Sequence, residues 1–285
     1  MANKMRLHLS SRQMKYFIKS FSSKALCLFV MSLASAITAR AEVIPIEPIE
    51  KGLFISSQPS MSMYWQGKNS KAVLIFIPGG EGYIRLKPGQ ADNTFHFHQM
   101  LKRLTNPTLT SGTFDAVLLD SPYELSPRQA YPSARGGSDH LIRIESAVRY
   151  YKEKTGLPVW LMGHSNGGIS LTEFVKHMQK ENKLNLVAGM IASGIRSESY
   201  FNAPLDMPVL FMHHKQDGCS HTLPDSSYSI YMKVKEFNKS VTEFVYVTEG
   251  ESDSKDPCRS GFHMYYGASD EAAKIIDAFM SKIYQ

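Results

Sequence analysis

Three side chains in this sequence have the types and the chain order that nucleophilic catalysis requires. Ser165 lies in the segment GHSNG at residues 163–167, which fits the pattern G-x-S-x-G. A serine hydroxyl becomes a strong nucleophile when a base takes its proton and an acid orients that base. Asp217 and His263 both follow Ser165 in the chain, each in a loop-like segment. They are the candidate acid and base for an acyl transfer.

The segments on either side of Ser165 explain why glycines flank it. Residues 159–162 form an apolar run that predicts a buried strand, and residues 169–180 predict a helix. A serine at the tip of so sharp a turn has a strained backbone, and larger flanking side chains would collide with the strand and helix. The helix N-terminus would direct N–H groups toward the serine. A glycine-rich turn without chemistry is the alternative, but the strand and helix favour a nucleophile elbow.

Predicted strands and helices alternate along the rest of the chain. This favours an α/β fold with a doubly wound, mostly parallel sheet and helices on both faces. The predicted strands are residues 72–77, 114–120, 159–162, 184–193, 208–213 and 242–248. The predicted helices are residues 92–104, 138–154, 169–180, 226–238 and 268–284. Alternating runs at 53–55 and 61–65 predict an N-terminal β-hairpin at the sheet edge.

The position of each acid relative to the predicted strands favours Asp217. In an open parallel sheet, functional groups gather at the carboxyl ends of the strands. Asp217 follows the strand at 208–213 by four residues, whereas Asp206 precedes it at the amino end. Asp225 lies further along and is better placed to cap a helix. A surface turn aspartate is the alternative interpretation of Asp217.

His263 is the best placed histidine, because it lies between the last predicted strand and the last predicted helix. A loop there can lean over the sheet edge to reach the serine. His213, His214 and His221 flank the acid, so any of them would put base and acid on the same turn. His164 lies within the elbow, where its side chain is expected to point away from the nucleophile.

An acyl-transfer intermediate carries an oxyanion that needs preorganised N–H donors. One is expected from Asn166, the residue after the serine. The other is expected from the glycine-rich loop GGEG at residues 79–82, which follows a predicted strand and allows close backbone approach. Gly80 is the first choice for this donor and Gly79 the second.

With these residues in this order, the chain resembles the serine hydrolases of the α/β-hydrolase fold, an esterase- and lipase-like superfamily. The resemblance covers the chain from about residue 72 to the C-terminus. It implies that Ser165 is the nucleophile, that His263 acts as general base and then acid, and that Asp217 partners the imidazole. Many members have His-Gly before the oxyanion residue, whereas this chain has Pro78-Gly79. That departure concerns the second oxyanion donor, not the nucleophile.

The lengths of the connections bear on the substrate. About 14 residues separate the strand ending near Ser193 from the next one at Pro208. Large lids of this fold are usually inserted there, so no large lid domain and no lid-gated lipase is expected. Tyr83, Tyr123 and Arg135 are predicted to line a pocket for a modest acyl or alcohol group. The alternative is that the tyrosines only pack their loops.

Residues 1–41 are predicted to be a signal peptide. A basic n-region precedes an apolar run at 25–37, and Ala39-Arg40-Ala41 fits an A-x-A cleavage site. Cleavage there would begin the exported chain at Glu42 and leave residues 42–285 as one domain. The apolar run is short for a membrane span. An uncleaved anchor is the alternative, because the n-region is unusually long.

The basic character of the chain comes from this leader. The chain has 32 Lys and Arg against 26 Asp and Glu, a formal net charge of +6. Seven of the basic residues and none of the acidic ones lie in residues 1–41, which leaves 25 against 26, a net charge of −1. The charge therefore gives no argument for binding nucleic acid, and no stable membrane insertion of the cleaved chain is expected.

Two cysteines remain beyond the leader, Cys219 and Cys258. An even number in an exported protein predicts a disulfide, with two buried thiols as the alternative. Such a bridge would tie the segment of Asp217 to the segment of His263. We expect it to fix the geometry of acid and base as well as to stabilise the fold.

These features favour an exported serine hydrolase that cleaves small-molecule carboxylic esters through a Ser-His-Asp triad and an acyl-enzyme. The alternatives are an amidase or peptidase of the same fold, or a binding protein without turnover. No cofactor is expected, because no phosphate-binding loop or dinucleotide fingerprint precedes a helix. No metal is expected either, since the histidines at 96, 98, 213, 214 and 221 form no complete ligand set.

Overall fold

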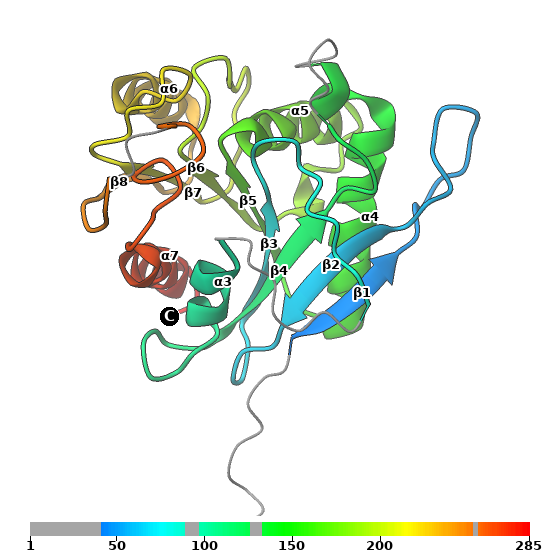
Figure 1. Cartoon of the computed structure of the whole chain (residues 1–285). Helices are drawn as coiled ribbons and strands as arrows, with labels where there is room; N and C mark the ends of the chain where they lie inside the picture. The colour runs from blue at the N-terminus through cyan, green and yellow to red at the C-terminus, as the bar shows by residue number, and fades with distance from the viewer. Residues whose placement is uncertain (1–40, 89–96, 126–132, 253–255) are drawn as a thin grey trace, which may run out of the picture. The chain divides into compact units, whose positions relative to one another are not determined.

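One mixed β-sheet runs through the computed structural model of the chain (Figure 1). The structure describes residues 41–88, 97–125, 133–252 and 256–285, so the predicted signal peptide lies almost wholly outside the described residues. The strands are β1 (Glu42–Ile46), β2 (Ser60–Trp65), β3 (Ala72–Ile77), β4 (Phe114–Asp120), β5 (Val159–His164), β6 (Gly189–Ser193), β7 (Val209–His214) and β8 (Thr242–Val247).

The sheet order is β1-β2-β4-β3-β5-β6-β7-β8. β2 pairs antiparallel with both β1 and β4, and every pairing from β4 to β8 is parallel. All six residues of β3 and all six of β5 are buried. This is the environment that their continuous apolar sequences require, because a parallel sheet is covered on both faces.

Helices cover the two faces of the sheet. They are α3 (Phe97–Leu104), α4 (Ser138–Thr155), α5 (Asn166–Lys180), α6 (Pro224–Phe237) and α7 (Ser269–Ile283), with short 3-10 turns at Ser133–Gly136 and Leu184–Leu186. Side chains of α4, α5 and α6 form one apolar cluster, and those of α3 and α7 form the other (Figure 1). The doubly wound, mostly parallel α/β architecture predicted from the sequence is confirmed.

The alternation of β3 shows how the two clusters share the sheet. Val73 and Ile75 pack on the α4 side, whereas Leu74 and Phe76 pack on the α3 side. Successive side chains of a strand point to opposite faces, so one strand supplies both cores. Burial of each such side chain contributes about 2 kcal/mol.

The predicted N-terminal hairpin is wrong in its first strand. Residues 42–46, not 53–55, pair with β2, and they bury Ile44 and Ile46. Pro45 interrupts the apolar pattern there, but an edge strand tolerates a proline that needs no ladder donor on its outer side. Leu53 and Phe54 lie instead in the connecting loop, with relative exposures of 92% and 85%.

The strand predicted at residues 184–193 is wrong in its first half, because Leu184–Leu186 form a 3-10 turn and β6 begins at Gly189. The other element boundaries move by a few residues, and the candidate residues follow the carboxyl ends of their strands. Predicted helix 92–104 is described only from Phe97 onward, and residues 89–96 lie outside the described part. The connection at 194–208 holds no helix or strand, which agrees with a fold without a large lid domain. Within the described residues, none of the helices combines the length and the apolarity that a membrane crossing needs.

Candidate active site

Ser165 sits in a strained turn between β5 and α5. Its φ of 53° and ψ of −121° lie where non-glycine residues are uncommon. A Cβ on Gly163 would lie 2.4 Å from the carbonyl oxygen of Gly167, and one on Gly167 would lie 2.1 Å from that of Ile77. Neither position can hold a side chain, so the glycines allow the strand, the turn and the helix to approach each other.

The loop after β3 passes directly over this turn. A Cβ on Gly79 would lie 2.9 Å from the Cβ of Ser165, which leaves room only for hydrogen at that position. Gly80 adopts a φ of 53°, in the left-handed region that favours glycine. The side-chain amide of Asn166 donates to the carbonyl oxygen of Gly80 at 2.9 Å. The two predicted oxyanion residues, Asn166 and Gly80, are therefore in contact beside Ser165.

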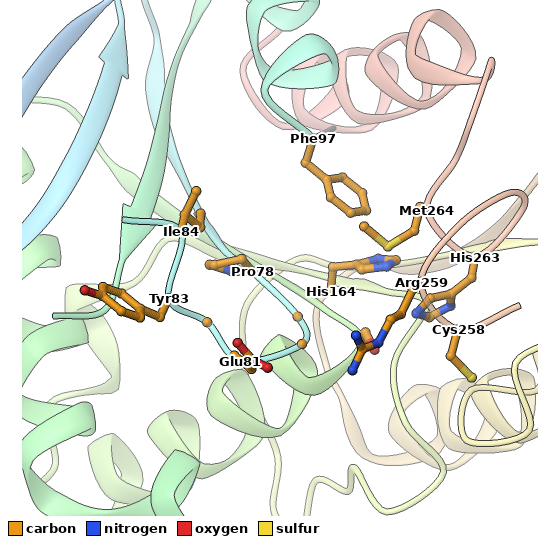
Figure 2. Close-up of a pocket in the computed structure, with 14 residues that line it drawn as sticks. Pro78, Glu81, Tyr83, Ile84, Phe97, His164, Cys258, Arg259, His263 and Met264 are labelled. Atoms are coloured by element: carbon orange, nitrogen blue, oxygen red, sulfur yellow. The ribbon is translucent and has the colours of Figure 1, made fainter. Parts of the chain in front are cut away.

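A pocket of about 530 Å³ opens at this point (Figure 2). Ser165 and His263 both line it, together with the loop at 78–84. The other lining side chains are those of Phe97, His164, Cys258, Arg259 and Met264. Its size is that of a site for a small organic ligand. The structure thus brings the candidate nucleophile and the candidate base into one concave surface.

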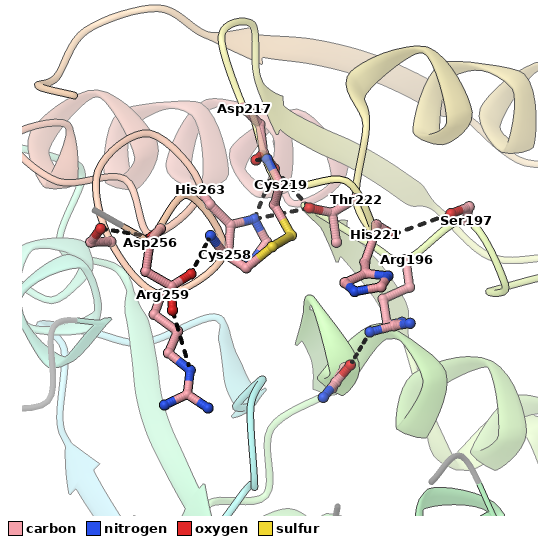
Figure 3. Close-up of a disulfide and its surroundings, with 12 residues drawn as sticks. Arg196, Ser197, Asp217, Cys219, His221, Thr222, Asp256, Cys258, Arg259 and His263 are labelled. Atoms are coloured by element: carbon pink, nitrogen blue, oxygen red, sulfur yellow. Dashed lines mark hydrogen bonds and ion pairs between the residues drawn. A yellow bond between two sulfur atoms is a disulfide. The ribbon is translucent and has the colours of Figure 1, made fainter. Parts of the chain in front are cut away.

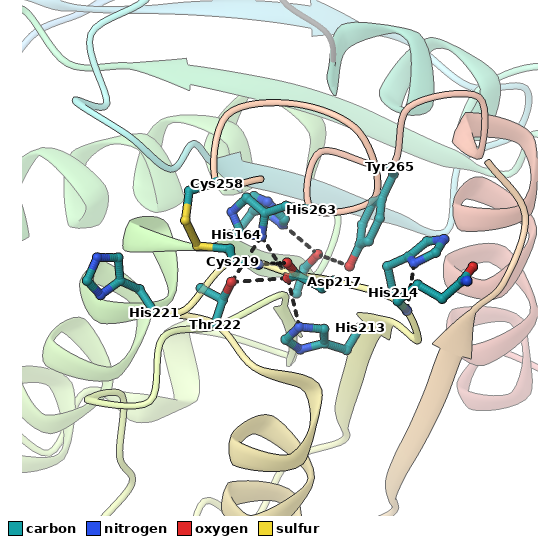
Figure 4. Close-up of polar contacts among 12 residues, drawn as sticks. His164, His213, His214, Asp217, Cys219, His221, Thr222, Cys258, His263 and Tyr265 are labelled. Carbon is teal, nitrogen blue, oxygen red and sulfur yellow. Dashed lines mark hydrogen bonds and ion pairs between the residues drawn. A yellow bond between two sulfur atoms is a disulfide. The ribbon is translucent and has the colours of Figure 1, made fainter. Parts of the chain in front are cut away.

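The imidazole of His263 is hydrogen-bonded to the carboxylate of Asp217. The Nδ1 atom of His263 lies 2.8 Å from Oδ2 of Asp217, and both side chains are almost completely buried (Figure 4). The same carboxylate oxygen accepts from the Thr222 hydroxyl at 3.0 Å and faces Nε2 of His213 at 3.0 Å. The backbone N–H of Cys219 donates to the other oxygen at 2.9 Å. Four donors therefore fix the orientation of this carboxylate.

These donors also decide the charge of Asp217. Burial alone would raise its pKa, but the hydrogen bonds from His213 and His263 outweigh burial and hold the pKa well below its usual range. Asp217 is therefore an ionised acceptor, so Nδ1 of His263 carries the proton that it receives. The Nε2 atom of a neutral His263 then has a free lone pair, which is what a general base requires.

His213 and Thr222 are site residues that the sequence interpretation missed. His213 was considered only as a competing base and set aside because it shares a turn with Asp217. That shared turn is the reason it can reach the same carboxylate from the end of β7. The sequence did contain a signal for this contact, because His213 precedes the candidate acid by four residues and lies at the carboxyl end of a predicted strand.

The sequence predicted that His164 would point away from the nucleophile, but its side chain lines the pocket. Its ring lies 4.9 Å from the ring of His263 and 4.4 Å from that of Phe97. Its Nδ1 atom is 3.0 Å from the hydroxyl of Ser193, which is 2.8 Å from that of Tyr265. Since Tyr265 donates to a main-chain carbonyl, Ser193 must donate to Tyr265 and His164 to Ser193. This series of hydrogen bonds fixes the orientation of the His164 ring next to the ring of His263.

The three predicted pocket residues have different outcomes. Tyr83 lines the pocket as expected. Tyr123 is outside the pocket lining, since its hydroxyl binds Asp139 and its ring lies under the guanidinium of Arg143. Arg135 is completely buried beneath the loop after β3, so its predicted place in the lining is also wrong. The loop that contains Tyr83 was predicted correctly to line the pocket. The sequence alone does not show which side chains of a loop face the pocket and which are buried against the protein.

Cys219 and Cys258 are paired at disulfide distance, with their Cα atoms 4.6 Å apart (Figure 3). Cys219 follows Asp217 by two residues, and Cys258 precedes His263 on the other loop. Figure 3 shows the pair beside the contact between His263 and Asp217. The two loops that carry the candidate acid and base are thus joined twice, covalently and through a hydrogen bond.

Replacing both cysteines by serine should weaken the fold and the site together. The pair closes a segment with a sequence separation of 39. Its loss should cost on the order of 3–4 kcal/mol of unfolding free energy and lower kcat/KM, because Asp217 and His263 become independently mobile. Urea unfolding and ester hydrolysis measure both effects. Reductant should affect the natural chain but not the double variant, and two alkylatable thiols in denatured, unreduced protein would exclude the bridge.

Within the described residues, no group of three or more histidine, cysteine, aspartate or glutamate side chains is arranged to hold a metal ion. The pocket lining includes the Ser165 hydroxyl and the buried imidazole of His263. The first N–H groups of a helix have no intrahelical acceptor. In α5 the N–H of Gly168 donates to the carbonyl oxygen of Ser165 at 2.9 Å, and the N–H groups of Asn166 and Gly167 precede it at the start of the helix.

Solved structures with this architecture identify the fold. No protein-family model matches the chain, and no curated protein matches it in sequence. A dienelactone hydrolase from Anabaena variabilis superposes with a TM-score of 0.58 at 12% identity, covering 86% of this chain and 98% of its own. A hyperthermophilic esterase from Pyrobaculum calidifontis gives 0.55 at 16% identity, covering 91% and 88%.

A third structure, from Xanthomonas campestris, is described as an α/β serine hydrolase without a lid. It superposes with a TM-score of 0.54 at 9% identity and covers 86% of this chain and 95% of its own. These likenesses cover between 86% and 91% of this chain. This chain therefore has the α/β-hydrolase fold.

Proposed function

We propose that the chain is a serine hydrolase that cleaves carboxylic esters of small molecules through an acyl-enzyme. Ser165 is the nucleophile, His263 the general base and acid, and Asp217 the group that orients and stabilises the imidazole. The observation that carries this proposal is the pairing of a strained Ser165 with His263 in one pocket, where Nδ1 of His263 is bound to an ionised Asp217. A glycine-rich turn with no chemistry would need neither the strain nor the buried histidine.

The first half of the reaction follows from these positions. Ser165 Oγ attacks the ester carbonyl carbon while its proton passes to Nε2 of His263. The carbonyl oxygen becomes an oxyanion, which the main-chain N–H groups of Asn166 and Gly80 stabilise. The tetrahedral intermediate collapses, the proton on His263 passes to the alkoxide, and the alcohol leaves. The acyl group remains on Ser165.

The second half repeats these steps with water. His263 takes a proton from the water as it attacks the acyl carbon, and the same N–H groups receive the new oxyanion. Collapse returns the proton from His263 to Ser165 and releases the carboxylic acid. Asp217 stays ionised throughout, because its four donors hold its pKa below the usual range. The ionised Asp217 therefore balances the positive charge of the His263 imidazolium whenever it forms.

The esters that suit the pocket are small. A space of about 530 Å³ bounded by Tyr83, Ile84, Phe97 and Met264 offers apolar contacts for a short acyl or alcohol group. The short connection at 194–208 leaves the pocket without an inserted lid domain. Two of the similar structures are described as a dienelactone hydrolase and an esterase, which supports an ester over an amide.

We also propose that the protein is exported after cleavage near Ala41. The leader-like composition of residues 1–41 and the cysteine pair support this, since disulfides persist in oxidising compartments. N-terminal sequencing of the exported protein should begin at Glu42. A retained Met1 in a membrane fraction would contradict it.

A substrate panel tests the proposed activity. The purified protein should hydrolyse p-nitrophenyl acetate and butyrate, act more slowly on the laurate, and leave the matching p-nitroanilides almost untouched. The size of the pocket favours the short acyl chains, and the anilides replace the ester bond by an amide. Faster cleavage of the anilides would assign an amidase, and absence of turnover on the whole panel would support a binding protein instead.

A further inference from the structure

The guanidinium of Arg135 lies beneath the loop that covers the nucleophile. Arg135 belongs to the 3-10 turn Ser133–Gly136, and its side chain has no exposed surface. Its Nη1 donates to the carbonyl oxygen of Pro78 at 3.1 Å, and its Nη2 donates to those of Gly79 at 3.3 Å and Gly80 at 2.9 Å. One buried side chain therefore holds three consecutive carbonyl groups of this loop.

Holding the carbonyls on one side determines where the N–H groups point. In a trans peptide the C=O and N–H bonds point in opposite directions. The carbonyl of Gly79 and the N–H of Gly80 belong to the same peptide, and that carbonyl is turned toward Arg135. The N–H of Gly80 is therefore directed away from Arg135, and the loop meets Ser165 at the preceding residue, Gly79. Among the described residues the N–H of Gly80 has no protein acceptor.

A second set of contacts ties Arg135 to the helix that begins at the nucleophile. Nη1 of Arg135 also donates to the hydroxyl of Ser170 in α5 at 3.0 Å, and this hydroxyl lies 2.8 Å from Nε2 of His140 in α4. Burial, with the charges of Arg135 and Arg143, lowers the pKa of His140 to about 3. His140 is therefore neutral, and it shares a hydrogen bond with the Ser170 hydroxyl without adding a competing charge.

We infer that Arg135 is a positioning residue for the oxyanion site. It fixes the peptides of residues 78–80 relative to α5, so that the N–H of Gly80 and the N–H of Asn166 converge on one point. Charge-assisted hydrogen bonds to the carbonyls also polarise these peptides, which makes their N–H groups stronger donors. The inference rests on the proposed function, because an oxyanion forms only if Ser165 attacks a carbonyl.

A merely structural role for Arg135 is the competing explanation, and Arg143 supplies the matched control. Arg143 is also buried, and it also donates to main-chain carbonyls, those of Gln58 at 2.7 Å and Ser56 at 2.8 Å. Its acceptors belong to the loop between β1 and β2, which does not line the pocket. Arg143 also pairs with the Asp139 carboxylate at 3.0 Å, a pair for which lysine keeps the charge. Arg135→Lys and Arg143→Lys therefore each remove buried hydrogen bonds to main-chain carbonyls, in the first case from a loop that lines the pocket and in the second from one that does not.

The test compares kcat, KM and the inhibition constant of a trifluoromethyl ketone, which forms an anionic adduct with a nucleophilic serine. Removing one oxyanion donor typically lowers kcat by about 100-fold or more, so a misplaced donor in Arg135→Lys should cost about 10- to 100-fold. The ketone should bind more weakly by a similar factor, with KM changed less than about 3-fold. Arg143→Lys should lower the melting temperature but keep kcat and ketone affinity.

Ser170→Ala provides a milder variant if Arg135→Lys does not fold. It removes one anchor of the guanidinium, and kcat should fall by about 3- to 10-fold with KM nearly unchanged. Unchanged kcat in the folded Arg135 or Ser170 variants, or an equal loss in Arg143→Lys, would overturn the positioning role while leaving the hydrolase intact. If the natural chain neither hydrolyses esters nor binds the ketone, the proposed function and this inference both fall.

Discussion

Ser165→Ala should reduce ester hydrolysis to background, a loss in kcat of about 100,000-fold or more. Without the hydroxyl, no acyl-enzyme forms, and the remaining donors can only bind the substrate. Substrate affinity should change little, because the same pocket walls remain. Steady-state hydrolysis of p-nitrophenyl butyrate measures kcat, and equilibrium binding of a non-hydrolysable analogue measures affinity.

The strained backbone of Ser165 provides an internal check on this variant. Alanine must keep the φ of 53°, whereas glycine adopts it without steric cost. Ser165→Gly should therefore be inactive yet more stable than Ser165→Ala by about 1 kcal/mol. Ser229→Ala, at an exposed helical serine, is the control that should retain full activity. Activity within tenfold of the natural chain in Ser165→Ala would show that another group is the nucleophile.

Asp217→Asn should lower kcat by about 10,000-fold with little change in KM. An amide in this position can direct its NH2 group at His263, so that Nδ1 becomes the acceptor and Nε2 carries the proton. His263 could then no longer take a proton from Ser165. Because Cys219, Thr222 and His213 also lose an ionised acceptor, the variant should be less stable as well.

Asp225→Asn is the matched control for this effect. Asp225 lies in the first turn of α6 and is exposed, so its loss should leave kcat unchanged. The pH dependence separates catalysis from stability, since Asp217→Asn should remain slow at every pH at which the protein is folded. A kcat within tenfold of the natural value would contradict the assignment of Asp217 as the partner of the catalytic imidazole.

The sequence predicted the fold and its candidate residues because both depend on local signals. Continuous apolar runs such as residues 72–77 identify strands buried on two faces, and the glycines around Ser165 mark a turn whose geometry permits few alternatives. Asp217 and His263 were found because chain order and strand ends together restrict where an acid and a base can meet. Their roles remain predictions until the variants are measured.

The features that the sequence did not reveal depend on long-range packing. Arg135 is a charged residue in a predicted loop, which usually indicates an exposed side chain. Nothing nearby in the chain shows that the carbonyl groups of residues 78–80 accept hydrogen bonds from it. The sequence made His213 an alternative to His263 as the base, whereas in the structure both histidines contact the same carboxylate oxygen of Asp217. The first strand, residues 42–46, was not predicted because a proline such as Pro45 usually indicates a loop, although an edge strand can contain one.

Covalent labelling of Ser165 tests the central claim most directly. The folded protein, treated with a fluorophosphonate and digested, should carry one adduct, on the peptide that contains Ser165. His263→Ala should slow the labelling, because the hydroxyl then lacks its base. Absence of any adduct on folded protein, or an adduct on a different serine, would contradict a nucleophilic Ser165.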